Sequence, residues 1–330
     1  MSTRSLTLIA PQIAPALARA IADGSARWPQ LARLAGRGSI ERLSQSRATD
    51  GLRPWQAALL ATLGLDAQYP SAAVTRTGES GERASGYWLH AQPMHFVAGL
   101  DRLTAIELQG EARIVNAERA ELESTVAAHL RASGFELLST SSGEWLMRSD
   151  RPLEVRTVSP AAAASNPLAE VMPQGRDAAQ LRRLMTELQM LLHEHPVSAQ
   201  RSRRGVPEIN AIWFYGEGAI GNVRRQVLPQ AFGDDAYLRG VYRLHDLAVE
   251  PTPRDAKTLL SCMTARAVAV IAAEDLDLLE VVWLAPLARA LRVGALARVD
   301  LVLDRWHLTI PRAASFKFWR QERSPAQWAA

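Results

Sequence analysis

The sequence predicts an α/β protein that carries a small α+β unit in its middle. Residues 267–273 form a continuous apolar run, which is typical of a parallel strand buried on both faces. Segments with helical and with strand-like patterns alternate on both sides of the middle of the chain. Between residues 87 and 215 two strand–helix–strand passes succeed one another, which is the pattern of a ferredoxin-like unit. We therefore expect an α/β body formed by residues 1–86 and 222–330, with an inserted α+β domain at 87–221.

The first part of the body begins with a short strand. Residues 6–10 are apolar and end at Pro11, so they predict a strand. Residues 13–22 and 55–63 have helical patterns, and Gly64 ends the second helix. Residues 76–86 (RTGESGERASG) are polar and turn-forming, which places the boundary to the inserted unit there.

The first half of the inserted unit contains several short strands and one helix. Residues 116–132 form the helix, and Gly134 is its expected C-cap. A hairpin that turns through Ser141, Ser142 and Gly143 comes next. The strands of this half are predicted at 87–90, 94–97, 103–108, 135–138 and 144–148. Residues 161–167 are expected to be a loop.

The second half of the inserted unit is one helix and one strand. Leucines recur at helical spacing and predict a helix over 178–194, with Asp177 as its N-cap and Pro196 as its stop. A polar turn with Arg201, Ser202, Arg203 and Arg204 comes after the helix. Residues 209–215 are rich in β-branched and aromatic side chains and predict the closing strand.

The α/β pattern returns after residue 221. Residues 223–231 are strand-like, and Asp234 or Asp235 caps a helix that runs to His245. After the strand at 267–273, a helix is expected at 283–291. A final hairpin is predicted at 300–303 and 306–310, turning at Asp304 and Arg305.

Composition limits the kinds of partner. The 330 residues carry a formal net charge of +4, and the arginines are dispersed, so we expect no nucleic-acid partner. A single cysteine excludes an intrachain disulfide and fits a reducing compartment. No apolar run reaches the length of about 18 residues that a membrane helix needs, and no convincing signal peptide is found. We therefore expect a cytoplasmic protein without a membrane partner, whose oligomeric state the sequence leaves open.

The stretch 181–221 resembles a known family. Its residues have an order that combines a helix, a His-Pro pair, an Arg, a Gly, an Asn, a Trp-containing strand and a Gly-x-Gly; the matching positions are His195, Pro196, Val197, Arg201, Gly205, Pro207, Asn210, Trp213, Gly216 and Gly218. This order resembles that of the archaeal-type, cofactor-independent phosphoglycerate mutases of the alkaline phosphatase superfamily. The sequence departs from the family at Ser198, where Asn is usual, and at Ile209, where Ala is usual.

A weaker likeness extends over most of the chain. It includes Trp283 and the run of Phe318, Trp319 and Arg320. In this respect the chain resembles a bacterial group called regulator-of-pathogenicity-factors E-like proteins. The resemblance implies an alkaline phosphatase-like α/β body with an inserted ferredoxin-like domain. It also implies a phosphotransferase that holds two divalent metal ions with Asp and His ligands and attacks phosphorus with Ser or Thr.

The chain departs from the metal-binding pattern that this family implies. The first strand is followed by Pro11 and Gln12 where the family has an Asp, and the nearest acid is Asp23. Asp304 and His307 lie on a predicted turn and strand, so we expect them to face opposite ways. His245 is better explained by a helix end. Ser44, Ser46 and Thr62 match the nucleophile by position only. We therefore predict no catalytic residue, no metal site and no cofactor.

Residues 216–221 (GEGAIG) also spell the dinucleotide fingerprint. That fingerprint should open a helix and be followed by an acid about 20 residues later. Asp234 and Asp235 come too early, and the family resemblance accounts for the glycines, so we do not assign a dinucleotide site.

Five residues are candidates for binding a ligand: His195, Arg201, Asn210, Gly216 and Gly218. Arg201 offers a planar fork for phosphate, or belongs to a solvated turn. His195 binds a ligand, or caps the preceding helix. Asn210 is either a turn-locking amide or a ligand contact. We expect the arginine-rich turn and Asn210 to lie at one rim of the inserted unit.

These observations lead to one functional hypothesis and two alternatives. The chain is predicted to be a non-catalytic, degenerate phosphoglycerate mutase-like protein with a regulatory or binding role toward a phosphorylated metabolite or a protein partner. The first alternative is an active cofactor-independent phosphoglycerate mutase or a metal-dependent phosphatase. The second is a purely structural interaction protein.

Overall fold

The computed structural model describes residues 4–24, 28–43, 51–66, 68–99 and 103–329. The chain divides into two compact units. Unit 1 comprises residues 1–44, 58–65 and 225–330, and unit 2 comprises 45–57 and 66–224. The segments 45–57 and 66–86 therefore belong with the middle of the chain, whereas the sequence placed them with the α/β body.

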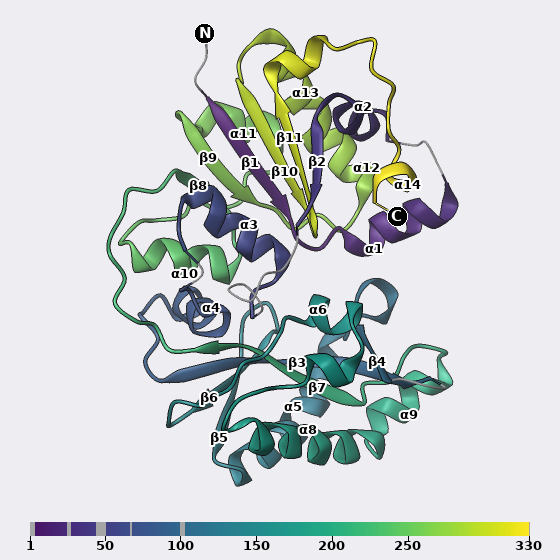
Figure 1. Ribbon diagram of the computed structural model, residues 1–330, viewed down its shortest axis with the longest axis vertical. Helices are drawn as coiled ribbons and strands as arrows, with labels where there is room; N and C mark the ends of the chain where they lie inside the picture. Colours follow the sequence, from purple (N-terminus) through teal and green to yellow (C-terminus); the bar gives the residue numbers. More distant parts are fainter. Residues whose placement is uncertain (1–3, 25–27, 44–50, 67, 100–102, 330) are drawn as a thin grey trace. The chain divides into compact units, whose positions relative to one another are not determined.

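Unit 1 is built on a six-stranded sheet with the order β2-β11-β10-β1-β9-β8 (Figure 1). Strands β8, β9, β1 and β10 run parallel, while β11 pairs antiparallel with β10 and with β2. The strands are β1 (Ser5–Ala10), β2 (Ser39–Arg42), β8 (Gln230–Phe232), β9 (Arg266–Val270), β10 (Arg298–Leu303) and β11 (Trp306–Pro311). Strands β1 and β9 lie in the same sheet and pair in parallel, and the α/β class predicted from the sequence is confirmed.

One face of this sheet is apolar because side chains alternate along each strand. Leu6 and Leu8 of β1 are buried in a core with Leu301 of β10 and the helices on that side. The helices and turns of unit 1 outside the sheet are α1 (Ala14–Asp23), α2 (Pro29–Arg37), α10 (Ala236–Leu244), α11 (Ala256–Cys262), α12 (Leu276–Leu278), the π-helix η2 (Leu279–Leu284), α13 (Ala285–Val293), the 3-10 turn η3 (Arg312–Phe316) and α14 (Pro325–Trp328). The opposite face carries Ser5 and Thr7, so one face of the sheet is apolar and the other is more polar.

Unit 2 contains an antiparallel sheet with ferredoxin-like connectivity. Strand β3 (Tyr87–Ala98) lies between β7 (Ala211–Gly218) on one side and β6 (Trp145–Ser149) on the other, and β5 (Phe135–Ser139) pairs with β6. The spatial order β7-β3-β6-β5, with α5 (Asn116–Ala132) and α8 (Ala178–His193) as the two crossovers, is that of a split β-α-β unit. The predicted inserted unit is confirmed at this level of topology.

The remaining elements of unit 2 surround this sheet. They are β4 (Leu103–Glu107), α4 (Ser71–Ser80), the 3-10 turn η1 (Gly110–Ala112), α6 (Pro160–Ser165), α7 (Leu168–Val171) and α9 (Pro196–Arg203). Helix α3 (Pro54–Leu63) is divided between the two units, since residues 58–65 belong to unit 1.

Several local predictions were wrong. Residues 223–229 have no regular structure, and only β8 forms a strand there. Residues 71–80 form helix α4 in spite of their Ser, Thr and Gly content. The expected loop at 161–167 contains helix α6, which Ser159 caps by accepting a hydrogen bond from the Ala162 amide. The cap explains why this Ala-rich segment is helical.

Helix α8 ends at His193, before Pro196, as predicted, but Pro196 also begins a second helix that was not predicted. It is the first residue of α9, where a proline loses no hydrogen bond because the first amides of a helix have no partner. The arginine-rich stretch is therefore the end of a helix.

Among the described residues, no helix is both long and apolar enough to cross a membrane.

Candidate functional site

The carboxyl ends of parallel strands are where open α/β sheets usually bind ligands. In unit 1 the strand β1 ends at Ala10 and is followed by Pro11 and Gln12, neither of which is acidic. After β8, Asp235 accepts a hydrogen bond from the Leu238 amide at 3.0 Å and caps α10. Asp235 thus serves local structure at this edge.

The described aspartates at this edge are hydrogen-bonded to backbone amides. Asp234 accepts a hydrogen bond from the Thr252 amide at 3.3 Å, and Asp275 accepts one from the Asp277 amide at 2.7 Å. Within the described ranges, no three His, Cys, Asp or Glu side chains are grouped as a metal site requires. Ser44 and Ser46 lie outside the described residues, and the hydroxyl of Thr62 donates to the Ala58 carbonyl at 2.8 Å.

His245 and His307 have structural partners in unit 1. His245 is the C-cap of α10, as the helix-end interpretation predicted, and its Nδ1 accepts a hydrogen bond from the Gln226 amide at 3.0 Å. Asp304 and His307 were expected to face opposite ways, and the aspartate that contacts His307 is Asp300. Asp304 occupies the left-handed turn of the hairpin at φ 54°, while the Nε2 of His307 lies 3.1 Å from Oδ1 of Asp300.

Arg201, the predicted phosphate fork, lies inside unit 2. Its side chain is fully buried and its Nη1 donates to Glu118 at 2.7 Å. Its other nitrogens donate to the carbonyls of Pro207 and Ala112. A ligand could reach this guanidinium only if these contacts opened, so the described structure gives Arg201 a packing role, and ligand binding there stays a prediction.

His195 and Asn210 also contact their own unit. His195 is the N-cap of α9, and its Nδ1 accepts a hydrogen bond from the Val197 amide at 3.3 Å. The side chain of Asn210 joins the strand β3 through both atoms of its amide. It accepts from the Phe96 amide at 2.7 Å and donates to the Phe96 carbonyl at 2.9 Å. The interpretation of Asn210 as a locking amide fits these bonds.

Gly216 and Gly218 are required by close packing of the backbone. Gly216 has φ +69°, and an added Cβ would lie 2.8 Å from Cβ of Ser71. At Gly218, with φ +147°, it would lie 2.7 Å from Cβ of Pro70. Residues 219–229 form no helix, so this glycine run lacks the helix that a dinucleotide site needs.

A buried polar network lies beside these glycines in unit 2. Ser71 donates to Oε1 of Gln56 at 2.9 Å, and His90 Nε2 lies 3.0 Å from the same hydroxyl. Since the Ser71 proton goes to Gln56, the ring of His90 must donate to Ser71. Burial, followed by the charge of Arg53, lowers the pKa of His90 to about 3. This histidine is therefore neutral and does not activate the serine.

Unit 1 contains a polar cleft of about 500 Å³ on the face of the sheet opposite the apolar core. That volume lies within the usual range of small-molecule sites. The strands contribute polar side chains and also Ala267 and Val268, and residues 58–62 contribute two alanines and a threonine. Leu43 and Pro229 complete the apolar part of the lining of the cleft. Its polar lining consists of Ser5, Thr7, Glu41, Thr62, Arg266, Arg298, Asp300 and His307.

Asp300 is the centre of the polar groups in this cleft. It is 8% exposed and accepts hydrogen bonds from Arg298 at 2.6 and 2.7 Å, from His307 at 3.1 Å and from Thr309 at 2.9 Å. Burial by itself raises the pKa of this carboxyl, but the hydrogen bonds from His307, Arg298 and Thr309 outweigh it and hold the pKa below its usual value. Asp300 is therefore a carboxylate that positions Arg298 and His307.

The sequence analysis missed this cleft, although a signal was present. Ser5 and Thr7 in β1, and Arg298 and Asp300 in β10, are polar residues at every second position of otherwise apolar strands. Such alternation in strands that also contribute to the main core shows that one face is polar. The sequence-based interpretation of those strands considered only their apolar residues.

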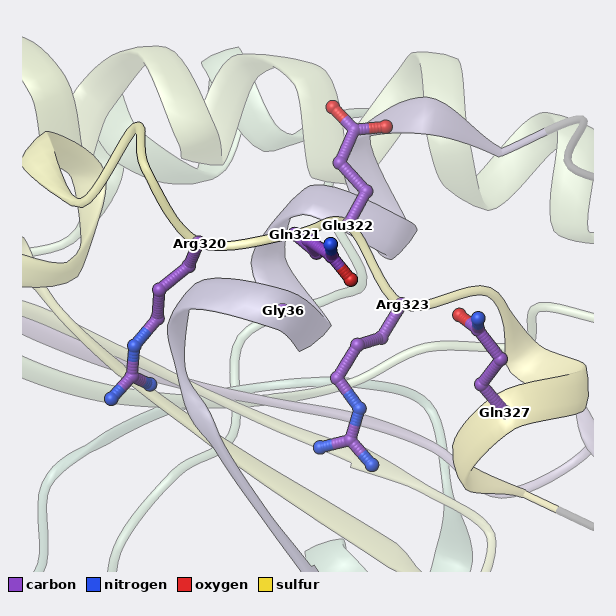
Figure 2. A pocket seen from close by; sticks show the side chains of 6 residues that line it. All are labelled: Gly36, Arg320, Gln321, Glu322, Arg323 and Gln327. Carbon is purple, nitrogen blue, oxygen red and sulfur yellow. The ribbon is translucent and has the colours of Figure 1, made fainter.

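A second hollow lies where the C-terminal segment passes α2 (Figure 2). It is lined by Gly36, Arg320, Gln321, Glu322, Arg323 and Gln327. Figure 2 shows the Arg320 and Arg323 side chains extending to one side of the segment and Glu322 to the other. A Cβ at Gly36 would lie 2.1 Å from the Gln321 carbonyl oxygen, so this glycine permits the close passage of the two segments. All the charged side chains here are exposed, unlike the centre of the cleft.

Part of the chain matches a known protein by sequence. No protein-family model matches this chain. A stretch of 59 residues is 36% identical to a 2,3-bisphosphoglycerate-independent phosphoglycerate mutase of Methanothrix thermoacetophila, which covers 18% of this chain and 15% of that protein. The match thus spans a small part of the curated relative.

Two solved structures align over nearly the full length of the chain. The cofactor-independent phosphoglycerate mutase of Thermoplasma acidophilum aligns with a TM-score of 0.40 and 14% identity, over 99% of this chain and 95% of that one. A protein of Pyrococcus horikoshii aligns with a TM-score of 0.41 and 13% identity, over 99% and 92%. The chain is similar to cofactor-independent phosphoglycerate mutases, as its sequence predicted.

Proposed function

We propose that this chain is a non-catalytic, phosphoglycerate mutase-like protein that binds a small phosphorylated metabolite and has a regulatory role. The observation that carries the proposal is the sequence after β1, where Pro11 and Gln12 follow Ala10. Neither side chain supplies the carboxylate that the family resemblance implies at this position. The neighbouring Asp235 and Asp275 cap helices, which uses carboxylate oxygens that a metal ion would need.

The likeness to a phosphoglycerate mutase supports the ligand class. The curated relative is named for a reaction on a phosphorylated three-carbon acid. We infer that this chain binds a ligand of the same chemical class. A protein partner is the other candidate for the binding role.

The alternative is an active phosphoglycerate mutase or metal-dependent phosphatase. It requires about two divalent ions per chain, because two metals carry the phosphate and activate the nucleophile in such sites. We expect elemental analysis of purified protein, after incubation with Mn²⁺ or Co²⁺ and gel filtration, to give well under one ion per chain.

Phosphatase and mutase assays with added Mn²⁺ accompany the metal analysis. We expect no turnover above a blank with buffer alone. Turnover that requires the metal and is abolished by EDTA would support the alternative instead. A stoichiometry near two ions per chain, with turnover, would overturn the proposal.

A further inference from the structure

We propose that the polar cleft of unit 1 is a binding site for a small phosphate monoester, with Arg266, Ser5 and Arg298 as its phosphate-binding row. The inference rests on the proposed function in that it gives the site and the chemical class of the ligand. It differs from the sequence-based prediction, which placed an anion near Arg201.

The row is fixed by the register of three adjacent parallel strands. Ser5 of β1 is paired with Arg266 of β9 on one side and with Arg298 of β10 on the other. Neighbouring strands are about 4.8 Å apart, and directly paired residues point to the same face of a sheet. The guanidinium groups of Arg266 and Arg298 therefore flank the Ser5 hydroxyl where these strands begin. All three residues line the cleft. The central position of β1 between β9 and β10 can be followed in Figure 1.

The charges of this row favour an anion. Arg298 uses its Nε and Nη2 on Asp300, which leaves Nη1 for a ligand. Arg266 is exposed and forms no ion pair with the described residues, so its planar fork is available for a ligand. A fork, a single N–H and a hydroxyl are three separate groups, which match the three terminal oxygens of a phosphate monoester better than the two of a carboxylate.

The other end of the cleft carries groups that suit the rest of such a ligand. Thr7 lies two residues along β1 from Ser5, about 6–7 Å away, and is paired with Asp300. Asp300 holds Nε2 of His307, whose side chain is 23% exposed, so Nδ1 of the ring is left for another partner. Glu41 is the cross-strand neighbour of His307. An imidazole and a threonine hydroxyl beside the phosphate row can bind a hydroxyl group of a short phosphorylated acid.

The cleft has a built interior, which separates it from the hollow beside α2. Thr7 and Asp300 are both buried to more than nine-tenths, and four donor contacts fix the Asp300 carboxylate. The side chains from residues 58–62 that close the cleft are two alanines and Thr62, whose hydroxyl is bonded within its helix. These small side chains leave the space open.

Isothermal titration calorimetry of the full chain tests the site. The probes are 3-phosphoglycerate, inorganic phosphate and glycerate at fixed ionic strength. We expect 3-phosphoglycerate to bind, phosphate to bind more weakly, and glycerate to bind at least tenfold more weakly than 3-phosphoglycerate. Arg266→Ala should weaken 3-phosphoglycerate binding by about ten- to a hundredfold, since it removes a charge-assisted contact.

Two further variants keep the result interpretable. Arg289→Ala removes another exposed arginine of unit 1, on α13 and outside the cleft, and should bind as the unmodified chain does. Ser5→Ala removes only the hydroxyl of the row and should weaken binding several-fold, which serves if Arg266→Ala fails to fold. Circular dichroism and a thermal melt establish that each variant is folded.

The outcomes separate this inference from the proposed function. The site is wrong if the unmodified chain binds neither phosphate compound, or if Arg266→Ala and Ser5→Ala both bind as tightly as Arg289→Ala. In either case the absence of turnover would still stand. Conversely, metal-dependent turnover would refute the non-catalytic function, while a loss of affinity confined to the row variants would still support the site.

Discussion

Replacing Arg201 by alanine should destabilise unit 2 rather than remove a ligand contact. The guanidinium is fully buried and donates to Glu118 and to two backbone carbonyls. Removing one partner of a buried ion pair typically costs about 3–5 kcal/mol, because the other charge stays buried without compensation. Arg204, whose side chain is 54% exposed, still reaches Glu118, so we expect a cost at the lower end, about 3 kcal/mol. That is a large part of the roughly 5–15 kcal/mol that stabilises a typical domain.

Urea unfolding followed by circular dichroism measures this loss. With a slope of about 2 kcal/mol per molar urea, a loss of about 3 kcal/mol moves the midpoint of unit 2 down by about 1.5 M. Hydrogen exchange in α5 and α9 should accelerate, since these helices contribute Glu118 and Arg201. Arg203→Ala is the matched control, because Arg203 is exposed on the same helix and should change the midpoint little.

The opposite result would refute this reasoning. If Arg201→Ala unfolds at the same urea concentration as Arg203→Ala but binds phosphate compounds more weakly, the guanidinium serves a ligand. The sequence-based interpretation of this arginine as a phosphate fork would then be correct.

Three further predictions concern unit 2. Its free energy of unfolding should fall as the pH drops from about 6.5 toward 3, since the pKa of His90 is about 3 when folded and higher when unfolded; His90→Gln should flatten this part of a pH titration of stability. Asn210→Ala should cost about 1–3 kcal/mol in urea unfolding, because the Phe96 amide and carbonyl lose their partner, and an unchanged midpoint would contradict this. Gly216→Ala should lower the melting temperature by several degrees, given φ +69° and a Cβ 2.8 Å from Ser71; a melt equal to that of the unmodified chain would show that the backbone can move.

Much of the fold could be predicted because it depends on local patterns of polarity. The apolar run near residue 270 predicted a buried parallel strand, and β9 is such a strand, paired in parallel with β1. The two strand–helix–strand passes predicted the ferredoxin-like order of unit 2. The final hairpin turns at Asp304, the residue whose left-handed backbone the turn requires.

The helix that begins at Pro196 was missed for a physical reason. Pro196 has no amide hydrogen, which makes it equally compatible with the end of one helix and the first turn of the next. The choice depended on whether His195 could cap the segment after it, and its Nδ1 does accept the Val197 amide. The sequence contains no signal for that side-chain orientation.

The candidate site could be predicted only in part, because it depends on long-range pairing. Ser5 is near the start of the chain and Arg266 and Arg298 are near its end, yet the three are neighbours in one row of the sheet. Arg201 was the opposite case, since its sequence context showed an arginine-rich stretch and not its burial against Glu118. Strand order and burial decide both, and neither is a local property.

The most direct test of a binding protein without phosphotransfer is a ³¹P NMR spectrum of 3-phosphoglycerate incubated with the full chain in Mn²⁺-free buffer, then with Mg²⁺ added. We expect the phosphate resonance to shift or broaden as the ligand binds near Arg266 and Arg298, with no new phosphate ester peak over several hours. The appearance of a 2-phosphoglycerate or inorganic phosphate peak, at a rate proportional to the protein concentration, would contradict the account.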